Sequence, residues 1–460
     1  MTELDHKAQS EALSPPKPAQ PITADQLLEL EERQRARCNG TNGEPRRIKT
    51  GCLEIDDYVL CASKNELNPG FERGIVVGLS AADGDESVGS RLISLNLIAT
   101  VLLQHVEMVN ATQNPQIKSR NASKPKVVVI DTTGSFNLPL LVKVLRSGLL
   151  KMRHETRSMN DTRMNHGNSH NSEADTEIEI QKEVYTMLEL VAISRVFDIE
   201  GLWEALSEIG RTDGQLSKDE EQENFNKNPS PKAKRAEKQA EPPLYKIPDE
   251  IGDSEEEDVE MTPPLVQPTT SNTSEAEIGP EILVIDNMHY LISHLFTHSE
   301  KSSAHNLLSL LSRTLHTLTH TQNILTILHN TTISTKINYT KPGARQAPPA
   351  IQSIITSVAQ KPSLGRIFDD FLDLHIMISK IPKRRADAEI LYGQDEKFSE
   401  EVNYCFVFEV LRDECPILGG DRGLGRKFGD REQRWGLFEI GNEGMELVDA
   451  FRGGEEMVMG

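Results

Sequence analysis

Three continuous apolar runs most strongly constrain the fold of this chain. They are Gly74–Leu79 (GIVVGL), Pro125–Thr132 (PKVVVIDT) and Glu281–Tyr290 (EILVIDNMHY), and the last two carry an aspartate directly after the apolar residues. Runs without alternation are typical of strands buried on both faces, as in parallel sheets. Helical patterns follow at Arg91–Val106 and Ser303–Thr321. The sequence therefore predicts an α/β fold with a mainly parallel twisted sheet and flanking helices.

Only part of the chain has the composition of a packed core. Of 460 residues, 37% are hydrophobic and 24 are prolines, which indicates one sizeable core with long solvated segments. An acidic stretch rich in proline and serine separates the second apolar run from the third, and we expect it to be disordered. The predicted order is a flexible N-terminal segment, the first half of the core, this acidic insertion, the second half of the core and a tail, at residues 1–45, 46–210, 211–280, 281–452 and 453–460.

The composition excludes several classes of protein. No apolar run reaches the roughly 18 residues of a membrane helix, and the longest, Leu92–Leu103, is interrupted. The first residues lack the cationic and apolar regions of a secretion signal. Five cysteines without a CxxC pair predict a reduced, intracellular protein. A formal net charge of −21 argues against a protein that coats DNA through bulk electrostatic attraction.

The turn after the first apolar run has the spacing of a phosphate-binding loop. Four residues separate Gly84 from Gly89, between a predicted strand and a predicted helix. The next two positions hold Ser90 and Arg91, where a P-loop has the Lys that neutralises phosphate charge and the Ser or Thr that holds Mg²⁺. Arg91 could offer its guanidinium to a phosphate, whereas acidic residues at 83, 85 and 86 oppose one. Weakened nucleotide binding and a remnant loop without useful affinity are equally compatible with this turn.

Two carboxylates follow the other apolar runs. Asp286 fits the Walker B arrangement, in which a buried strand delivers one carboxylate to the metal side of a nucleotide, and it is the candidate Mg²⁺ ligand. Asp131 precedes Thr133, near the position where an ATPase needs a base to activate water. Because threonine cannot act as that base, the sequence offers no catalytic residue.

Taken in order, these motifs resemble the RecA-type ATPase core of the eukaryotic strand-exchange recombinases and their paralogues. The series that carries the resemblance is Thr50–Asp56 (TGCLEID), Gly70–Ile75 (GFERGI), the P-loop-spaced turn, Ile130–Phe136 (IDTTGSF), Leu283–Asp286 (LVID) and Ile327–Asn330 (ILHN). Two later segments also fit, Pro362–Asp370 (PSLGRIFDD) and Glu432–Ile440 (EQRWGLFEI), the second resembling the final β-hairpin of the family.

The resemblance implies a RecA-like P-loop core with a C-terminal β-hairpin, and ATP with Mg²⁺ as possible cofactors. Its nucleotide-binding positions correspond to Gly84, Gly89, Ser90, Arg91, Asp286 and Asn330, of which Asn330 matches the sensor residue. The P-loop Lys and Ser/Thr are replaced, the catalytic Glu corresponds to Thr133, and the helical N-terminal DNA-binding domain has no counterpart. The family pattern therefore implies a divergent paralogue with hydrolysis lost or weak.

Two segments are candidates for DNA contact. The family loop after the sensor Asn corresponds to Thr331–Gln360, with the cations Lys336, Lys341 and Arg345. The connection Gly419–Arg434 between two predicted strands is rich in cations that include Arg426 and Lys427. Surface loops without DNA contact remain the alternative for both segments.

Other features carry weaker predictions. Ala24–Arg37 has one narrow apolar stripe and is either a solvated helix or a partner-docking peptide. His316 and His320 share a helix face, but HTLTH lacks the third ligand of a zinc site, so ordinary surface histidines are favoured. A basic cluster at Pro231–Lys238 is more typical of a solvated patch than of a nuclear address, and Ser254, ahead of four acids, is a possible phosphorylation site.

The resemblance implies a nuclear recombinase paralogue that assists DNA repair by homologous recombination. Its expected partners are sibling paralogues or the recombinase itself, with DNA reached through the complex and no membrane. Two alternatives stay open. One is an active DNA-dependent ATPase of the same family, and the other is a structural RecA-like subunit of a complex outside recombination, of the tRNA-modifying elongator type.

Overall fold

The structure is a computed structural model that describes the chain in several stretches. These are residues 23–26, 28, 47–60, 69–111, 124–161, 173–210, 279–334, 353–355, 360–392, 402–415, 433–441 and 445–451. All lie in one unit that spans Met1–Gly210 and Gly279–Gly460. Residues 211–278, the second unit, lie outside the described residues, as do the tail from 452 and most of the predicted N-terminal segment. Of the predicted helix Ala24–Arg37, the described residues 24–26 and 28 are helical.

A ten-stranded sheet forms the centre of the described unit. Its order is β10-β9-β8-β7-β1-β5-β4-β2-β3, and β6 pairs with β5. The strands are β1 (Val76–Ala81), β2 (Val127–Asp131), β3 (Val191–Arg195), β4 (Ile282–Asp286), β5 (Leu325–Ser334), β6 (Gln360–Pro362), β7 (Leu374–Pro382), β8 (Tyr404–Asp413), β9 (Trp435–Ile440) and β10 (Leu447–Asp449). Six strands that are neighbours in the sheet are parallel, namely β7, β1, β5, β4, β2 and β3. Strands β8, β9 and β10 continue beyond β7 as antiparallel neighbours.

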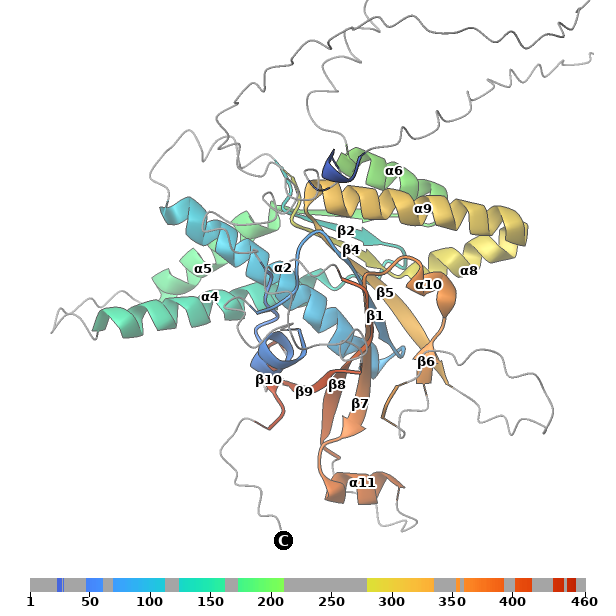
Figure 1. Ribbon diagram of the computed structural model, residues 1–460. Helices are drawn as coiled ribbons and strands as arrows, with labels where there is room; N and C mark the ends of the chain where they lie inside the picture. Colours follow the sequence, from blue (N-terminus) through green and yellow to red (C-terminus); the bar gives the residue numbers. More distant parts are fainter. Residues whose placement is uncertain are drawn as a thin grey trace, which may run out of the picture. The chain divides into compact units, whose positions relative to one another are not determined.

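Helices cover both faces of this sheet (Figure 1). They are the short helical turn η1 (Glu54–Val59) and the helices α2 (Asp85–Ala111), α4 (Leu138–Asp161), α5 (Glu173–Leu188), α6 (Ile199–Gly210), α8 (Met288–His298), α9 (Lys301–Gln322), α10 (Arg366–Asp369) and α11 (Arg385–Tyr392). One hydrophobic cluster joins α2, α4 and α5 to one sheet face, and a second joins α6, α8, α9 and α10 to the other.

Strand β4 shows why its sequence is apolar without alternation. Ile282 and Val284 belong to the first cluster, and Leu283 and Ile285 belong to the second. Because successive side chains of a strand point to opposite faces, a central strand covered by helices on both sides needs apolar residues at every position. The predicted fold class, an α/β core with a mainly parallel sheet, flanking helices and antiparallel C-terminal strands, is confirmed.

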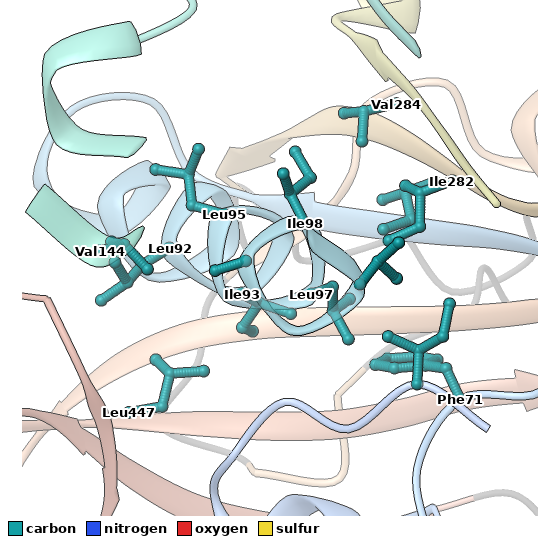
Figure 2. Packing of buried hydrophobic residues seen from close by; sticks show 14 of the residues in the cluster. Phe71, Leu92, Ile93, Leu95, Leu97, Ile98, Val144, Ile282, Val284 and Leu447 are labelled. Atoms are coloured by element: carbon teal, nitrogen blue, oxygen red, sulfur yellow. The ribbon is translucent and has the colours of Figure 1, made fainter. Parts of the chain in front are cut away.

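Helix α2 lies against the first face and is apolar nearly all round. Its residues Leu92, Ile93, Leu95, Leu97 and Ile98 are buried, and Figure 2 shows them with side chains of α4, β4 and β10 in one cluster. Burying a side chain of this size contributes roughly 1.5–3 kcal/mol. By length and composition alone Ser87–Met108 could cross a membrane, but 61% of that stretch is buried inside the protein, as in a core helix.

Several predicted boundaries are wrong. Helix α2 begins at Asp85 and ends at Ala111, so it extends beyond the predicted helix Arg91–Val106 at both ends and covers most of the P-loop-spaced residues. Helix α4 continues to Asp161, and α5 begins at Glu173. Arg153 bonds Glu179 and Glu183 across these two helices, which joins their polar ends. In the predicted loop 331–360, the first four residues extend β5 and the last begins β6.

Candidate functional site

The candidate residues lie at the carboxyl ends of neighbouring parallel strands. Asp131 of β2 is in register with Asp286 of β4, and Asn330 of β5 is in register with Ser80 of β1. Helix α2 starts just after β1, at the same edge of the sheet. Ligands of open α/β sheets bind at this edge, so the topology brings the predicted strand-tip residues into one region. Within this region Arg91, two residues after Gly89, contacts Asp286 at the tip of β4.

The P-loop-spaced turn does not form a phosphate-binding loop. Gly84 lies in the turn with φ +89°, but α2 begins at the next residue and Gly89, Ser90 and Arg91 lie inside it. Ser87 already donates its backbone N–H and its hydroxyl to the Gly84 carbonyl, at 3.1 and 2.7 Å. The expectation of a loop from Gly84 to Gly89 is therefore wrong. A phosphate cradle needs several backbone N–H groups that face the ligand. Gly89, Ser90 and Arg91 lie beyond the first turn of α2, so their N–H groups are used within the helix.

Gly89 has a packing role in this helix. A Cβ atom at Gly89 would lie 2.9 Å from Cδ1 of Phe406 on β8 and 3.4 Å from Cγ2 of Ile378 on β7. The absence of a side chain therefore lets α2 approach the antiparallel part of the sheet closely. Ser90 is likewise buried, and its hydroxyl donates to the Ser87 carbonyl at 3.0 Å.

Asp286, the candidate metal ligand, is held by a cation of its own chain. Its Oδ2 lies 3.2 Å from Nε of Arg91, and Nη2 of Arg91 donates to Oγ of Ser135 at 2.8 Å. The Asp286 side chain is 5% exposed and that of Arg91 is 35% exposed. Burial lowers the pKa of nearby His329, Asp286 raises it and Arg91 lowers it. His329 also shares a hydrogen bond of 2.8 Å with Oγ of Ser94.

Asp131 organises the loop that follows it. Its Oδ1 accepts backbone N–H bonds from residues 133, 134 and 135, and its Oδ2 accepts one from Phe136. These bonds hold the segment Thr133–Phe136 in a tight turn and use the carboxylate as a structural acceptor. Thr133, at the position of the family Glu, is exposed and shares a 2.6 Å hydrogen bond with Ser135.

Asn330, the candidate sensor, is also bonded within the chain. Its amide nitrogen donates to Oγ of Ser80 at 3.1 Å, and its amide oxygen accepts from Oγ of Ser363 at 2.9 Å. Ser80 lies 2.9 Å from Nε2 of His375, whose Nδ1 lies 2.8 Å from Oδ1 of Asp369. The Asp369 carboxylate accepts, so Nδ1 of His375 donates to it, and in this tautomer Nε2 accepts the Ser80 hydroxyl. Both Ser80 and His375 are fully buried, so this row resembles a hydrolase triad without any access for substrate.

This buried row was missed by the sequence prediction. Ser80 and His375 each stand among apolar residues, in β1 and β7, and Asp369 lies six residues before His375. Only the register of β5, β1 and β7 brings them together. A polar residue inside a run that is otherwise buried is the signal that could have identified them.

The predicted DNA-binding residues lie outside the described residues. This applies to Lys336, Lys341, Arg345, Arg426 and Lys427. Within the candidate loop, the described residues 353–355 are fixed by Glu409 of β8, which is buried. Its carboxylate accepts the Ser353 hydroxyl at 2.5 Å and the Ile354 N–H at 2.7 Å. The far end of that loop is thus attached to the sheet.

The residues do not fit a magnesium nucleotide as they stand. The Asp286 carboxylate pairs with the Arg91 guanidinium, and the Asp131 carboxylate accepts hydrogen bonds from backbone N–H groups. The nitrogen and the oxygen of the Asn330 side-chain amide are both hydrogen-bonded. In the described part of the chain, no group of three or more His, Cys, Asp or Glu side chains could hold a metal ion. His316, from the predicted surface pair, contacts Asp373 at 3.7 Å.

Comparison with known proteins shows a likeness to solved structures. No family model matches the chain, and no curated protein sequence matches it. Among solved structures it is similar to the crystal structure of the RadB recombinase, at 12% identity and a TM-score of 0.38, over 87% of this chain and 99% of that one. The fold class follows from the strand order and registers of this chain itself.

Proposed function

We propose that this chain is a RecA-fold recombinase paralogue that acts in DNA repair by homologous recombination. In this proposal it is a nuclear mediator or assembly subunit that binds the recombinase or sibling paralogues. Its ATP binding is weak or vestigial, and DNA is reached mainly through the complex.

One observation carries the proposal: the three polar strand-tip side chains that a nucleotide would need are bonded within the chain. Asp131, Asp286 and Asn330 each have internal partners at hydrogen-bond or ion-pair distance. Losing one preorganised electrostatic group at a phosphoryl-transfer site costs on the order of 10² to 10³ in rate. Several such groups are replaced here, so a role in assembly fits the fold better than a role in hydrolysis.

Purification of the tagged protein with candidate partners tests the assembly role. We expect sibling paralogues or the recombinase to co-purify equally with Mg-ATP and with EDTA. A strain lacking the protein should be sensitive to DNA damage. Normal repair in that strain, together with no such partner, contradicts the proposal.

Two further measurements separate the alternatives. ATP turnover is measured with and without single-stranded DNA, for the wild type and for Asp286→Ala. We expect no DNA-stimulated turnover that depends on Asp286, and a turnover that the substitution abolishes would favour the active ATPase. Co-purification with tRNA and absence from damage foci would favour the elongator-type subunit. Binding of DNA by the cations of 331–360 and 419–434 stays a prediction within this proposal.

A further inference from the structure

Arg91 occupies an informative position in the P-loop spacing. Counting from Gly84 and Gly89, it stands where a P-loop carries the Ser or Thr whose hydroxyl holds Mg²⁺. That hydroxyl and the Walker B carboxylate share the metal ion in P-loop proteins. In this chain the side chain at the hydroxyl position is itself a cation.

The guanidinium of Arg91 contacts the Walker B carboxylate and a hydroxyl of the neighbouring strand tip. Nε is 3.2 Å from Oδ2 of Asp286 at the tip of β4, and Nη2 donates to Ser135 in the loop after β2. Ser135 is held in turn by Asp131 through its backbone N–H. Arg91 therefore links helix α2 to the ends of two neighbouring strands.

A second cation cannot share this carboxylate without a penalty. Asp286 is buried, and like charges at contact distance repel strongly where water is excluded. His329, the other basic group near this pair, has its pKa lowered mainly by burial, which disfavours its charged form. Arg91 is thus the cation that balances Asp286 among the described residues at this edge.

We propose that Arg91 is a built-in cation that replaces the metal ion and its hydroxyl ligand as one unit. The edge of the sheet then needs neither a divalent ion nor a nucleotide to hold α2, β2 and β4 together. Restoring a hydroxyl at this position should uncover a divalent-cation site made of that hydroxyl, Asp286 and water. The inference concerns this edge alone, so it can fail while the recombination role stands, and the reverse also holds.

Binding of Mn²⁺ tests the proposal, with thermal unfolding as a second measurement. The full-length wild type is compared with Arg91→Thr and with the double variant Arg91→Thr/Asp286→Asn. We expect no saturable Mn²⁺ site in the wild type, one per chain in Arg91→Thr, and none in the double variant. Without metal, Arg91→Thr should unfold at least about 3 °C below the wild type, and Mg²⁺ should restore part of the loss.

Matched controls make the result decisive. Arg146→Thr removes an exposed arginine that pairs with Glu177 at 2.7 Å. It should not change Mn²⁺ binding, and it should shift the midpoint of thermal unfolding by no more than about 1 °C. If Arg91→Thr does not fold, Arg91→Lys keeps the positive charge and should still exclude Mn²⁺. A wild-type Mn²⁺ site that Asp286→Asn abolishes, a folded Arg91→Thr without one, or Mn²⁺ binding by Arg91→Lys would each overturn the proposal.

Discussion

Gly89 shows how one residue can keep a motif spacing and serve a different purpose. A methyl group at this position would lie 2.9 Å from the ring of Phe406, which stacks on Phe438 with centroids 5.2 Å apart. Because that ring cannot move freely, we expect Gly89→Ala to destabilise the protein by roughly 1–3 kcal/mol, despite the better helix propensity of alanine. Urea unfolding measures the loss. The control is Gly210→Ala in α6, where the nearest atom is 3.7 Å away and little change is expected.

Asp56 gives a pH dependence at the residue scale. Burial raises its pKa to about 6, although its carboxylate accepts hydrogen bonds from Thr50 and Gly51. Since the folded protein holds this proton more tightly than the unfolded chain, Asp56 adds stability below pH 4 and loses it as the pH rises to about 6. A shift of two pKa units corresponds to about 3 kcal/mol.

Asp56→Asn removes this titration. The free energy of unfolding of the variant, relative to that of the wild type, should rise by up to about 3 kcal/mol between pH 4 and pH 7, because only the wild type loses the Asp56 contribution. Unfolding by urea at several pH values gives both curves. Parallel curves would show that Asp56 titrates normally in the folded protein.

The polar residues were only partly predictable from the sequence. Asp131 and Asp286 were both predicted to follow apolar runs, and the pairing of the parallel strands β2 and β4 places them in register at one edge. The partner of Arg91 was not foreseen, because spacing does not say which way a long side chain turns once its residue lies inside a helix. The partner of His375 could not be predicted, since Ser80 lies 295 residues away along the chain and only the pairing of β1 with β7 brings the two together.

At the scale of elements, a row of buried hydrogen bonds ties three strands together. It runs from Asp369 through His375 of β7 and Ser80 of β1 to Asn330 of β5. Removing one member leaves its neighbours buried without a partner, which costs about 1–3 kcal/mol per group. The row therefore favours one register among β7, β1 and β5.

A double-mutant cycle tests this coupling. Ser80→Ala and Asn330→Ala should each destabilise the protein, and the double variant should lose about 0.5–3 kcal/mol less than the sum, because they share one hydrogen bond. Equilibrium unfolding in urea gives the three values. Ser207→Ala on the exposed face of α6, where the hydroxyl bonds Trp203, is the matched hydroxyl deletion and should be nearly neutral. Strict additivity of Ser80→Ala and Asn330→Ala would contradict the coupling.

Strands were more predictable than helix ends. Strands β1, β2 and β4 are buried on both faces, so each is a continuous apolar run, and its predicted position agrees with the observed one to within a few residues. The first turn of α2 and the end of α4 are polar and carry no apolar periodicity, and their helical state depends on continuation from a buried segment. Single-sequence periodicity cannot detect such extensions.

At the scale of the whole molecule, residues that follow the acidic segment are bonded to residues that precede it. Glu281, soon after residue 278, lies 3.3 Å from Arg73 and 3.7 Å from Lys126, and all three side chains are buried. Its backbone N–H donates to Lys126 ahead of β2, and its carbonyl accepts from Leu325 at the start of β5. These bonds fix the chain at the point where it re-enters the sheet.

Replacement of residues 211–278 by a flexible linker of roughly 15 glycines and serines tests this closure. Both hydrophobic clusters are built from residues on the two sides of that segment, so the core should keep its fold. Shortening the connection about fourfold should stabilise the protein by about 1 kcal/mol through loop entropy. Thermal and urea unfolding measure the change, with Glu281→Gln in the same background as a variant that loses the buried ion pairs. A large loss of stability from the replacement alone would mean that the acidic segment supplies contacts the core needs.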